Sequence, residues 1–212
     1  MKKFIIIAIL SHFGVTLTKI IEITDLAEIS PHIDGDNTLI IFDVDDTLVK
    51  ADKTKLKEIE PLIEELPELN TKNLKLKWFL AQASQKNLKQ IINELQERGR
   101  VIALTQCKNL KPFYKLYQID KIGLDFNKAF PNCPLIELEA SKGKAIFDNG
   151  VACCGKNNKG EVLFNFLQKI NYRPSEIIFA DDKLHNLINV EYYMQQLKIP
   201  VTSFWYTRVK KN

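Results

Sequence analysis

The sequence predicts an α/β fold, a doubly wound and mostly parallel Rossmann-like sheet with helices on both faces. Four short apolar runs rich in β-branched residues predict strands, and amphipathic helical patterns lie between them. The runs are almost continuously apolar, which is typical of strands that are covered on both faces. Alternation of strands and helices favours parallel strands joined by crossover helices.

Three of the four predicted strands run directly into polar residues. The strands are Thr38–Phe42, Arg100–Leu104, Glu176–Ala180 and Pro200–Trp205. The first is followed by Asp43, the second by Thr105 and the third by the pair Asp181 and Asp182. In an open α/β sheet the carboxyl ends of the strands form the edge where ligands bind. The sequence therefore predicts a polar site at this edge.

Three amphipathic patterns predict helices, and one turn signal predicts a hairpin. The helical patterns cover Leu88–Leu95, Val162–Ile170 and Leu184–Leu197, and Gly99 is well placed to end the first helix. Asp148, Asn149 and Gly150 separate two short apolar runs, which is a pattern typical of a β-hairpin.

Residues from about 49 to 86 fall outside this alternation of strands and helices. Helix formers are mixed there with Pro61 and Pro67, and basic and acidic blocks follow one another. We expect a small helical cap insertion, either a lid over the site or a solvated helical excursion.

Length and composition indicate one folded domain. The chain has 212 residues, of which 45% are hydrophobic and 26% are charged, so disorder and coiled coil are excluded. The net charge of +4 is small and the lysines are dispersed among acidic residues, so we expect no nucleic-acid partner. The sequence makes no prediction about the oligomeric state.

The N-terminus allows two interpretations. Met1–Lys3 is basic and Phe4–Leu10 is apolar, as in a secretory signal, but Ser11 and His12 interrupt the run and no clean cleavage site follows. Residues 1–17 are therefore a signal peptide or an N-terminal extension, ahead of a core at 18–212. The first alternative implies a periplasmic or secreted protein and the second a cytoplasmic one. The run is too short for a stable membrane span.

The four cysteines are predicted to be small buried hydrophobic residues. They are Cys107, Cys133, Cys153 and Cys154, and they contain no C-x-x-C pattern, so a zinc site is not expected. Cys153 and Cys154 are adjacent, and we expect no bridge between them. Cys107 follows Thr105 closely, and we expect it to be packed rather than catalytic.

The acidic residues at the strand ends predict a metal site. Asp43, Asp45 and Asp46 follow the first strand, and Asp181 and Asp182 follow the third. Crowded carboxylates repel one another unless a cation neutralises them. Ligands that are all oxygen favour Mg²⁺, which also bridges to a substrate phosphate.

Four motifs in order resemble those of the haloacid dehalogenase (HAD) superfamily. The run Asp43–Leu48 (DVDDTL) after an apolar strand is similar to its first motif, and Thr105 to its second. Lys159, which opens the second predicted helix, is similar to the third motif, and Asp181 with Asp182 to the fourth. The Asn-Lys-Gly and Asp-Asp-Lys-x-x-Asn stretches further resemble a little-characterised bacterial family of HAD-like proteins.

The resemblance implies a magnesium-dependent phosphomonoester hydrolase that works through an aspartyl phosphate. It implies that Asp43 is the nucleophile and that Asp45 moves protons to the leaving group and from water. Asp43, Asp181 and the main-chain carbonyl of Asp45 would hold the metal. Asp182 would act through a water molecule or from the second shell, with Asn186 either bridging near it or lying on the helix without a role.

The resemblance also assigns the phosphoryl oxygens to Thr105 and Lys159. Thr105 has the alternative role of a helix cap, and Lys156 in the same polar loop remains an alternative to Lys159. The substrate is expected to be phosphorylated, but the residues that follow Thr105 match no substrate class.

Three other functions are alternatives to phosphatase activity, and Asp45 bears on the first of them. A dehalogenase of this superfamily needs no proton donor, so Asp45 favours phosphoryl transfer. A response-regulator receiver would place its phosphorylated aspartate on a later strand than the acidic pair. A HAD-like binding or regulatory module with little turnover is the remaining alternative.

Overall fold

The protein is described by a computed structural model that covers residues 4–11, 14–35, 37–52, 54–55, 57–58, 80–107, 112–133 and 135–209. The strands are β1 (Phe4–Ser11), β2 (Gly14–Ile23), β3 (Thr38–Phe42), β4 (Val49–Ala51), β5 (Ala81–Ala83), β6 (Arg100–Thr105), β7 (Leu135–Leu138), β8 (Ala145–Asp148), β9 (Val151–Cys153), β10 (Glu176–Asp181) and β11 (Val201–Tyr206). The helices are η1 (Leu26–His32), α3 (Leu88–Arg98), α4 (Pro112–Lys121), η3 (Asn127–Ala129), α5 (Lys159–Lys169) and α6 (Leu184–Gln196).

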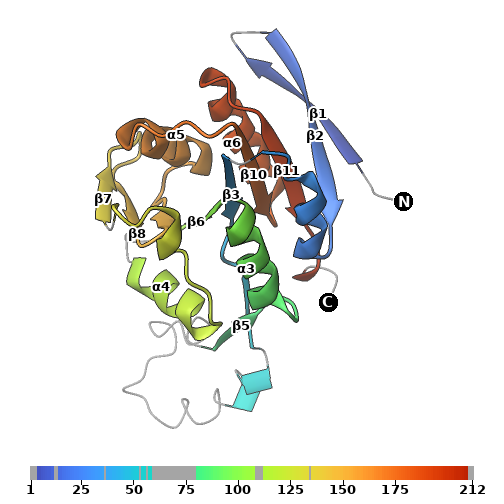
Figure 1. Ribbon diagram of the computed structural model, residues 1–212, viewed down its shortest axis with the longest axis vertical. Helices are drawn as coiled ribbons and strands as arrows, with labels where there is room; N and C mark the ends of the chain where they lie inside the picture. The colour runs from blue at the N-terminus through green and yellow to red at the C-terminus, as the bar shows by residue number, and fades with distance from the viewer. Residues whose placement is uncertain are drawn as a thin grey trace.

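A mostly parallel sheet forms the centre of the described structure (Figure 1). Its nine strands lie in the order β1-β2-β11-β10-β3-β6-β9-β8-β7. The strands from β2 to β9 in this order are paired parallel, and β1, β8 and β7 pair antiparallel at the two edges. The predicted α/β fold with a mostly parallel sheet is confirmed.

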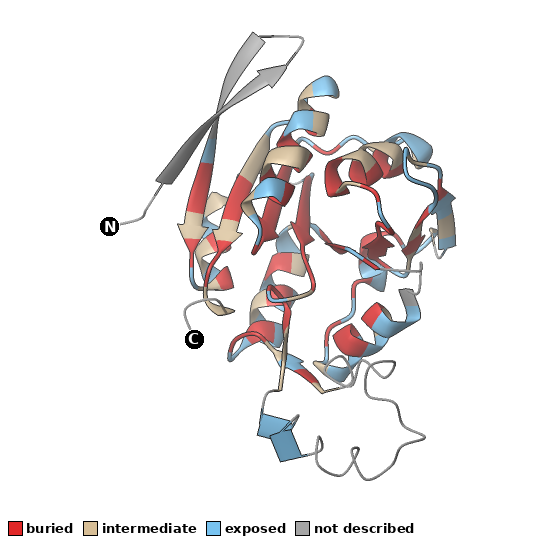
Figure 2. Ribbon diagram, turned by 180° about the vertical axis from the view of Figure 1, so that it is seen from behind, coloured by how far each residue is buried: buried red, intermediate tan, exposed pale blue. Residues whose placement is uncertain are grey.

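Alternate residues of the central strands pack against helices on opposite faces. Ile40 and Phe42 of β3 belong to the cluster that contains residues of η1, α3 and α4. Leu39 and Ile41 belong to the cluster that contains residues of α5 and α6. The two-residue period of a strand sends successive side chains to opposite faces, so continuous apolar runs become strands covered on both sides. Figure 2 shows the resulting buried strands between the helices.

Helix α3 ends where the sequence predicted. The Gly99 N–H donates to the Leu95 carbonyl at 3.0 Å, and β6 begins at the next residue. The φ of Gly99 is −171°, which any residue adopts, so its small size matters for another reason. A Cβ there would lie 2.7 Å from the main-chain oxygen of Thr38, which is closer than a side chain tolerates. Glycine lets the end of α3 lie directly against the start of β3.

The predicted hairpin is present as β8 and β9. Asp148 pairs with Val151 in an antiparallel register, and the two turn residues have positive φ values, 47° at Asn149 and 82° at Gly150. This combination is typical of the primed turns that join two strands by a two-residue loop. Strand β9 then lies parallel to β6, so the hairpin extends the sheet beyond the predicted site.

Two short strands form the base of the predicted insertion. Strand β4 pairs antiparallel with β5, so the chain returns close to the point at which it left the core. The predicted helical cap between them falls mostly on residues 59–79, which lie outside the described residues.

The N-terminal segment forms an antiparallel pair of strands, β1 and β2. Strand β2 continues past residue 17 and joins β11 from Ile20 to Ile23, which is the part of β2 that belongs to the predicted core. None of the described helices combines the length and apolar character needed to cross a membrane.

Candidate active site at the carboxyl edge of the sheet

Three neighbouring strands bring the predicted polar residues together. Strands β10, β3 and β6 are adjacent, and Asp181, Asp43 and Thr105 lie at their carboxyl ends. The Asp43 N–H donates to the Ala180 carbonyl at 2.9 Å, so Asp43 continues the ladder between β3 and β10. Side chains that lie far apart in the sequence thus meet at one edge of the sheet, as the strand ends predicted.

Three buried carboxylates form a candidate metal site. One oxygen each from Asp43, Asp181 and Asp182 lies within 4.8 Å of the others. The all-oxygen donor set fits Mg²⁺, and burial makes the mutual repulsion of these groups costly without a cation. Two of the five expected acids lie outside this group: the Asp45 side chain pairs with Lys115, and Asp46 is exposed.

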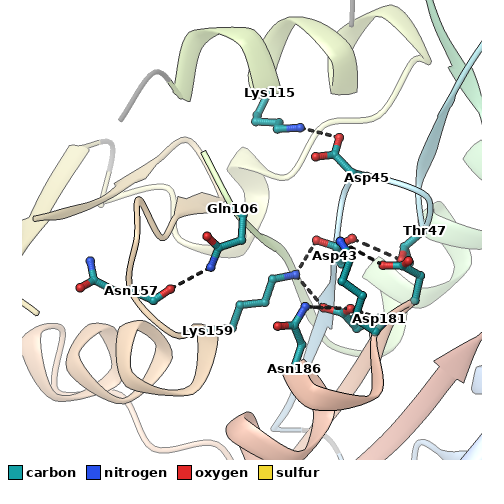
Figure 3. Close-up of polar contacts among 11 residues, drawn as sticks. Asp43, Asp45, Thr47, Gln106, Lys115, Asn157, Lys159, Asp181 and Asn186 are labelled. Atoms are coloured by element: carbon teal, nitrogen blue, oxygen red, sulfur yellow. Dashed lines mark hydrogen bonds and ion pairs between the residues drawn. The ribbon is translucent and has the colours of Figure 1, made fainter. Parts of the chain in front are cut away.

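Lys159 lies between two of these carboxylates (Figure 3). Its Nζ donates to Asp43 Oδ1 and, at 2.7 Å, to Asp181 Oδ2, and its side chain is 1% exposed. Burial alone would lower the pKa of Lys159, but the charges of Asp181 and Asp43 outweigh it and raise the pKa above its ordinary value. Lys156, the alternative in the sequence, is exposed.

One lysine does not neutralise two carboxylates. Burial raises the pKa of Asp43 although Lys159 opposes this, and the charge of Asp181 raises it further. Two carboxylates beside one ammonium leave this group with a net negative charge. This net negative charge favours binding of a divalent cation beside Asp43.

A glycine allows Lys159 to reach this depth. Gly160 follows it in the first turn of α5, and a Cβ there would collide with the main-chain oxygen of Asn189 in α6. The close approach of the two helices therefore requires glycine at this position. The Asn-Lys-Gly stretch of the sequence thus sets the position of α5 as well as the lysine.

Asn186 holds Asp181 in a fixed orientation. Its Nδ2 donates to both carboxylate oxygens, at 3.0 and 2.9 Å, and the Lys183 N–H donates to Asp181 Oδ1 at 2.8 Å. The sequence placed Asn186 near Asp182, and the structure instead gives it Asp181 as its partner. The start of α6 therefore supports the acid that ends β10.

A tight turn after β3 separates Asp45 from Asp43. The Asp46 N–H donates to the Val49 carbonyl at 2.7 Å, and Asp46 has a φ of 61°. Asp45 Oδ1 accepts from Lys115 Nζ at 2.5 Å, and the two side chains are 20% and 8% exposed. Burial raises the pKa of the Asp45 carboxyl, and the Lys115 charge opposes that rise.

Lys115 is a residue of this site that sequence reasoning missed. It lies on α4, a helix that was not predicted, four residues before the buried Ile119. This i, i+4 spacing places a lysine on the buried side of an amphipathic helix. Lysines are rarely buried without a partner, so this spacing was the available signal.

Thr105 presents a buried hydroxyl to the site. The residue is fully buried, and its Oγ1 has no hydrogen-bond partner among the described residues. Leaving a hydroxyl unsatisfied costs free energy, so a ligand oxygen is a natural partner for it. The geometry agrees with a role in binding rather than in capping α4, which begins seven residues later at Pro112.

The prediction that all four cysteines are isolated hydrophobic residues was wrong for two of them. Cys107 and Cys153 form a disulfide with their Cα atoms 5.1 Å apart. Strands β6 and β9 are parallel neighbours, and Thr105 is in register with Cys153, so Cys107 comes within bonding distance just beyond the strand. Cys154 is a buried free thiol and Cys133 is a partly buried one.

A second contact ties the segment after Thr105 to the neighbouring loop. The Gln106 side chain donates through Nε2 to the Asn157 carbonyl at 2.8 Å (Figure 3). The disulfide and this hydrogen bond together link the carboxyl end of β6 to the loop that leads into α5. The backbone around Thr105 is therefore held relative to Lys159.

Comparisons with known proteins give one family and one structural likeness. A solved structure described as a haloacid dehalogenase-like family hydrolase from Streptococcus pneumoniae is similar at 14% identity and a TM-score of 0.45, over 79% of this chain and 84% of that one. No curated protein matches the chain. Residues 63–212 match the model of a family described as a protein of unknown function (DUF2608), and the chain belongs to that family.

Proposed function

We propose that the protein is a magnesium-dependent phosphomonoester hydrolase of the HAD type. The observation that carries this proposal is the burial of Asp43, Asp181, Asp182 and Lys159 together at the carboxyl ends of adjacent strands. Structural ion pairs seldom gather three buried acids around one lysine, because the unbalanced charge destabilises the fold. A phosphoryl group and a divalent cation would balance the charges of this cluster.

The carboxylates of Asp43, Asp181 and Asp182 would hold the metal, together with the main-chain carbonyl of Asp45. A bound Mg²⁺ supplies positive charge to the phosphoryl oxygens and lowers their repulsion of an attacking carboxylate. Asn186 contributes by holding Asp181 in the orientation that the site needs.

Asp43 acts as the nucleophile in this proposal. An oxygen of its carboxylate attacks phosphorus and forms an acyl phosphate while the bond to the ester oxygen breaks. Asp45 gives its proton to that leaving oxygen. A water molecule then loses a proton to Asp45 and attacks phosphorus, which releases inorganic phosphate and restores the Asp43 carboxylate.

Thr105 and Lys159 bind the phosphoryl oxygens. The hydroxyl of Thr105 can donate a hydrogen bond to a phosphoryl oxygen, because it has no partner among the described residues. The ammonium of Lys159 lies beside Asp43. Charge spreads over these oxygens in the transition state, where fixed donors in a buried site are most effective. The substrate in this proposal is a phosphorylated molecule.

The test uses an aryl phosphate, Mg²⁺ and two matched variants. Asp43→Asn should abolish turnover, and rapid acid quenching of the wild type should leave phosphate on the peptide that contains Asp43, detected by mass spectrometry. Asp46→Asn is the control, because Asp46 is an exposed carboxylate of the same turn and asparagine tolerates its positive φ. Turnover that survives in Asp43→Asn would refute this mechanism, and an inactive wild type would favour a binding module.

A further inference from the structure

We infer that Lys115 is a positioning residue that holds the Asp45 side chain in one orientation beside Asp43; this inference rests on the proposed function. Lys115 Nζ lies 2.5 Å from Asp45 Oδ1, across 70 residues of sequence. Figure 3 shows the lysine reaching from α4 toward the turn that carries Asp45, apart from the group around Lys159.

Two different lysines pair with the two aspartates of the first motif, Asp43 and Asp45. Lys159 contacts Asp43 and Asp181, whereas Lys115 contacts Asp45. The proposed nucleophile and the proposed proton carrier therefore have separate cationic partners. Each partner also comes from a different helix, α5 for one and α4 for the other.

The Lys115–Asp45 pair is sheltered enough to fix a side chain. Lys115 is 8% exposed and Asp45 is 20% exposed, unlike an ion pair on an open surface. Solvent screens an exposed ion pair, so its attraction is too weak to hold two long side chains in place. Burial reduces that screening and strengthens the attraction. A charged hydrogen bond of this kind is also shorter and stronger than a neutral one.

The backbone alone does not set the position of the Asp45 carboxylate. The turn is closed by hydrogen bonds from Leu48 and Val49 to the Val44 carbonyl, at 3.0 and 2.9 Å. These bonds join main-chain atoms alone and make no contact with the Asp45 carboxylate. Lys115 supplies the contact that selects one rotamer, and α4 is itself packed against β5, β8 and β9.

Orientation matters because of the task given to Asp45. A proton donor acts only within hydrogen-bond reach of the leaving oxygen, and a displacement of about 1 Å can cost about 100-fold in rate. A lysine that acts through Asp45 should therefore matter most for esters whose leaving group needs a proton. It should matter little for aryl phosphates, whose leaving group departs with little help.

The experiment measures kcat and KM of five variants, which include Asp45→Asn alone, on an alkyl and an aryl phosphate with saturating Mg²⁺. Lys115→Met keeps the length of the side chain without the charge, Lys115→Arg keeps the charge, and Lys121→Ala replaces an exposed lysine of the same helix as a control. Asp45→Asn combined with Lys115→Met completes a double-mutant cycle. Circular dichroism checks that each variant is folded.

We expect Lys115→Met to lower kcat on the alkyl ester by about 10- to 100-fold, with a smaller loss on the aryl ester and little change in KM. Lys115→Arg should recover part of the loss, and the double variant should be no slower than Asp45→Asn alone. Additive losses, or equal losses on both esters, would overturn the positioning role while leaving the phosphatase function in place. A folded wild type that hydrolyses neither ester would overturn both.

Discussion

Asn186 donates its side-chain amide to both carboxylate oxygens of Asp181, at 3.0 and 2.9 Å. The contact orients an acid that ends β10 from the first turn of α6, and both residues are buried. A carboxylate that is held in this way can present its remaining lone pairs to a metal without losing rotational freedom on binding.

The first prediction concerns this support of Asp181. Asn186→Ala should weaken Mg²⁺ binding about 10- to 100-fold, because groups that orient a metal ligand typically contribute that much. Isothermal titration of Mg²⁺ measures the affinity directly. His185→Ala changes an exposed neighbour on the same helix and should leave the affinity unchanged. Equal affinity in wild type and Asn186→Ala would show that the contact of Asn186 with Asp181 does not support metal binding.

The second prediction concerns the metal itself. EDTA should abolish phosphatase activity and Mg²⁺ should restore it, since three buried carboxylates need a cation to approach a phosphate. Mg²⁺ should also raise the melting temperature of the wild type, because it binds the folded state. Asp181→Asn should lose that rise. Full activity in metal-free buffer would exclude this mechanism.

The third prediction separates the two aspartates of the first motif. Asp45→Asn should retain part of the first step with an aryl phosphate but hydrolyse the aspartyl phosphate very slowly, because water still needs a base. General acid–base help is worth about 10²–10⁴-fold. Rapid mixing should show a burst of phenol near one equivalent per enzyme. A burst in Asp43→Asn and none in Asp45→Asn would reverse the two roles.

The fourth prediction concerns the disulfide between Cys107 and Cys153. The bond spans 46 residues, so chain entropy predicts a loss of about 4 kcal/mol from the free energy of unfolding when it is reduced. Urea denaturation with and without a phosphine reductant measures the difference. Cys107→Ser should show the lower stability and no further loss on reduction. Cys133→Ser is the control, because its thiol is free.

The fifth prediction concerns the other buried thiol. Burial raises the pKa of Cys154 to about 12, so the thiol stays neutral far above the pH at which an exposed cysteine ionises. The thiolate is the reactive form, so iodoacetamide at pH 8.5 should modify Cys133 well before Cys154 in the folded protein. Peptide mass spectrometry after timed quenching reads both sites. Equal labelling rates at the two sites would contradict this burial.

Features that depend on neighbours along the chain could be predicted from the sequence. Apolar runs that end in Asp43, Thr105 and Asp181 were enough to predict strands and a polar edge, because a strand and the residue after it are local features. The hairpin at Asn149 and Gly150 was predictable for the same reason. Local periodicity also predicted a helix over Val162–Ile170, and α5 begins three residues earlier, at Lys159.

Which of these features come into contact depends on how the strands and helices pack in three dimensions. Cys107 and Cys153 became partners because β9 lies beside β6, and no local pattern in the sequence encodes that strand order. Lys115 reached Asp45 because α4 packs near the turn after β3, across 70 residues. Such contacts depend on the packing of the whole sheet and its helices, which sums many weak interactions rather than one readable motif.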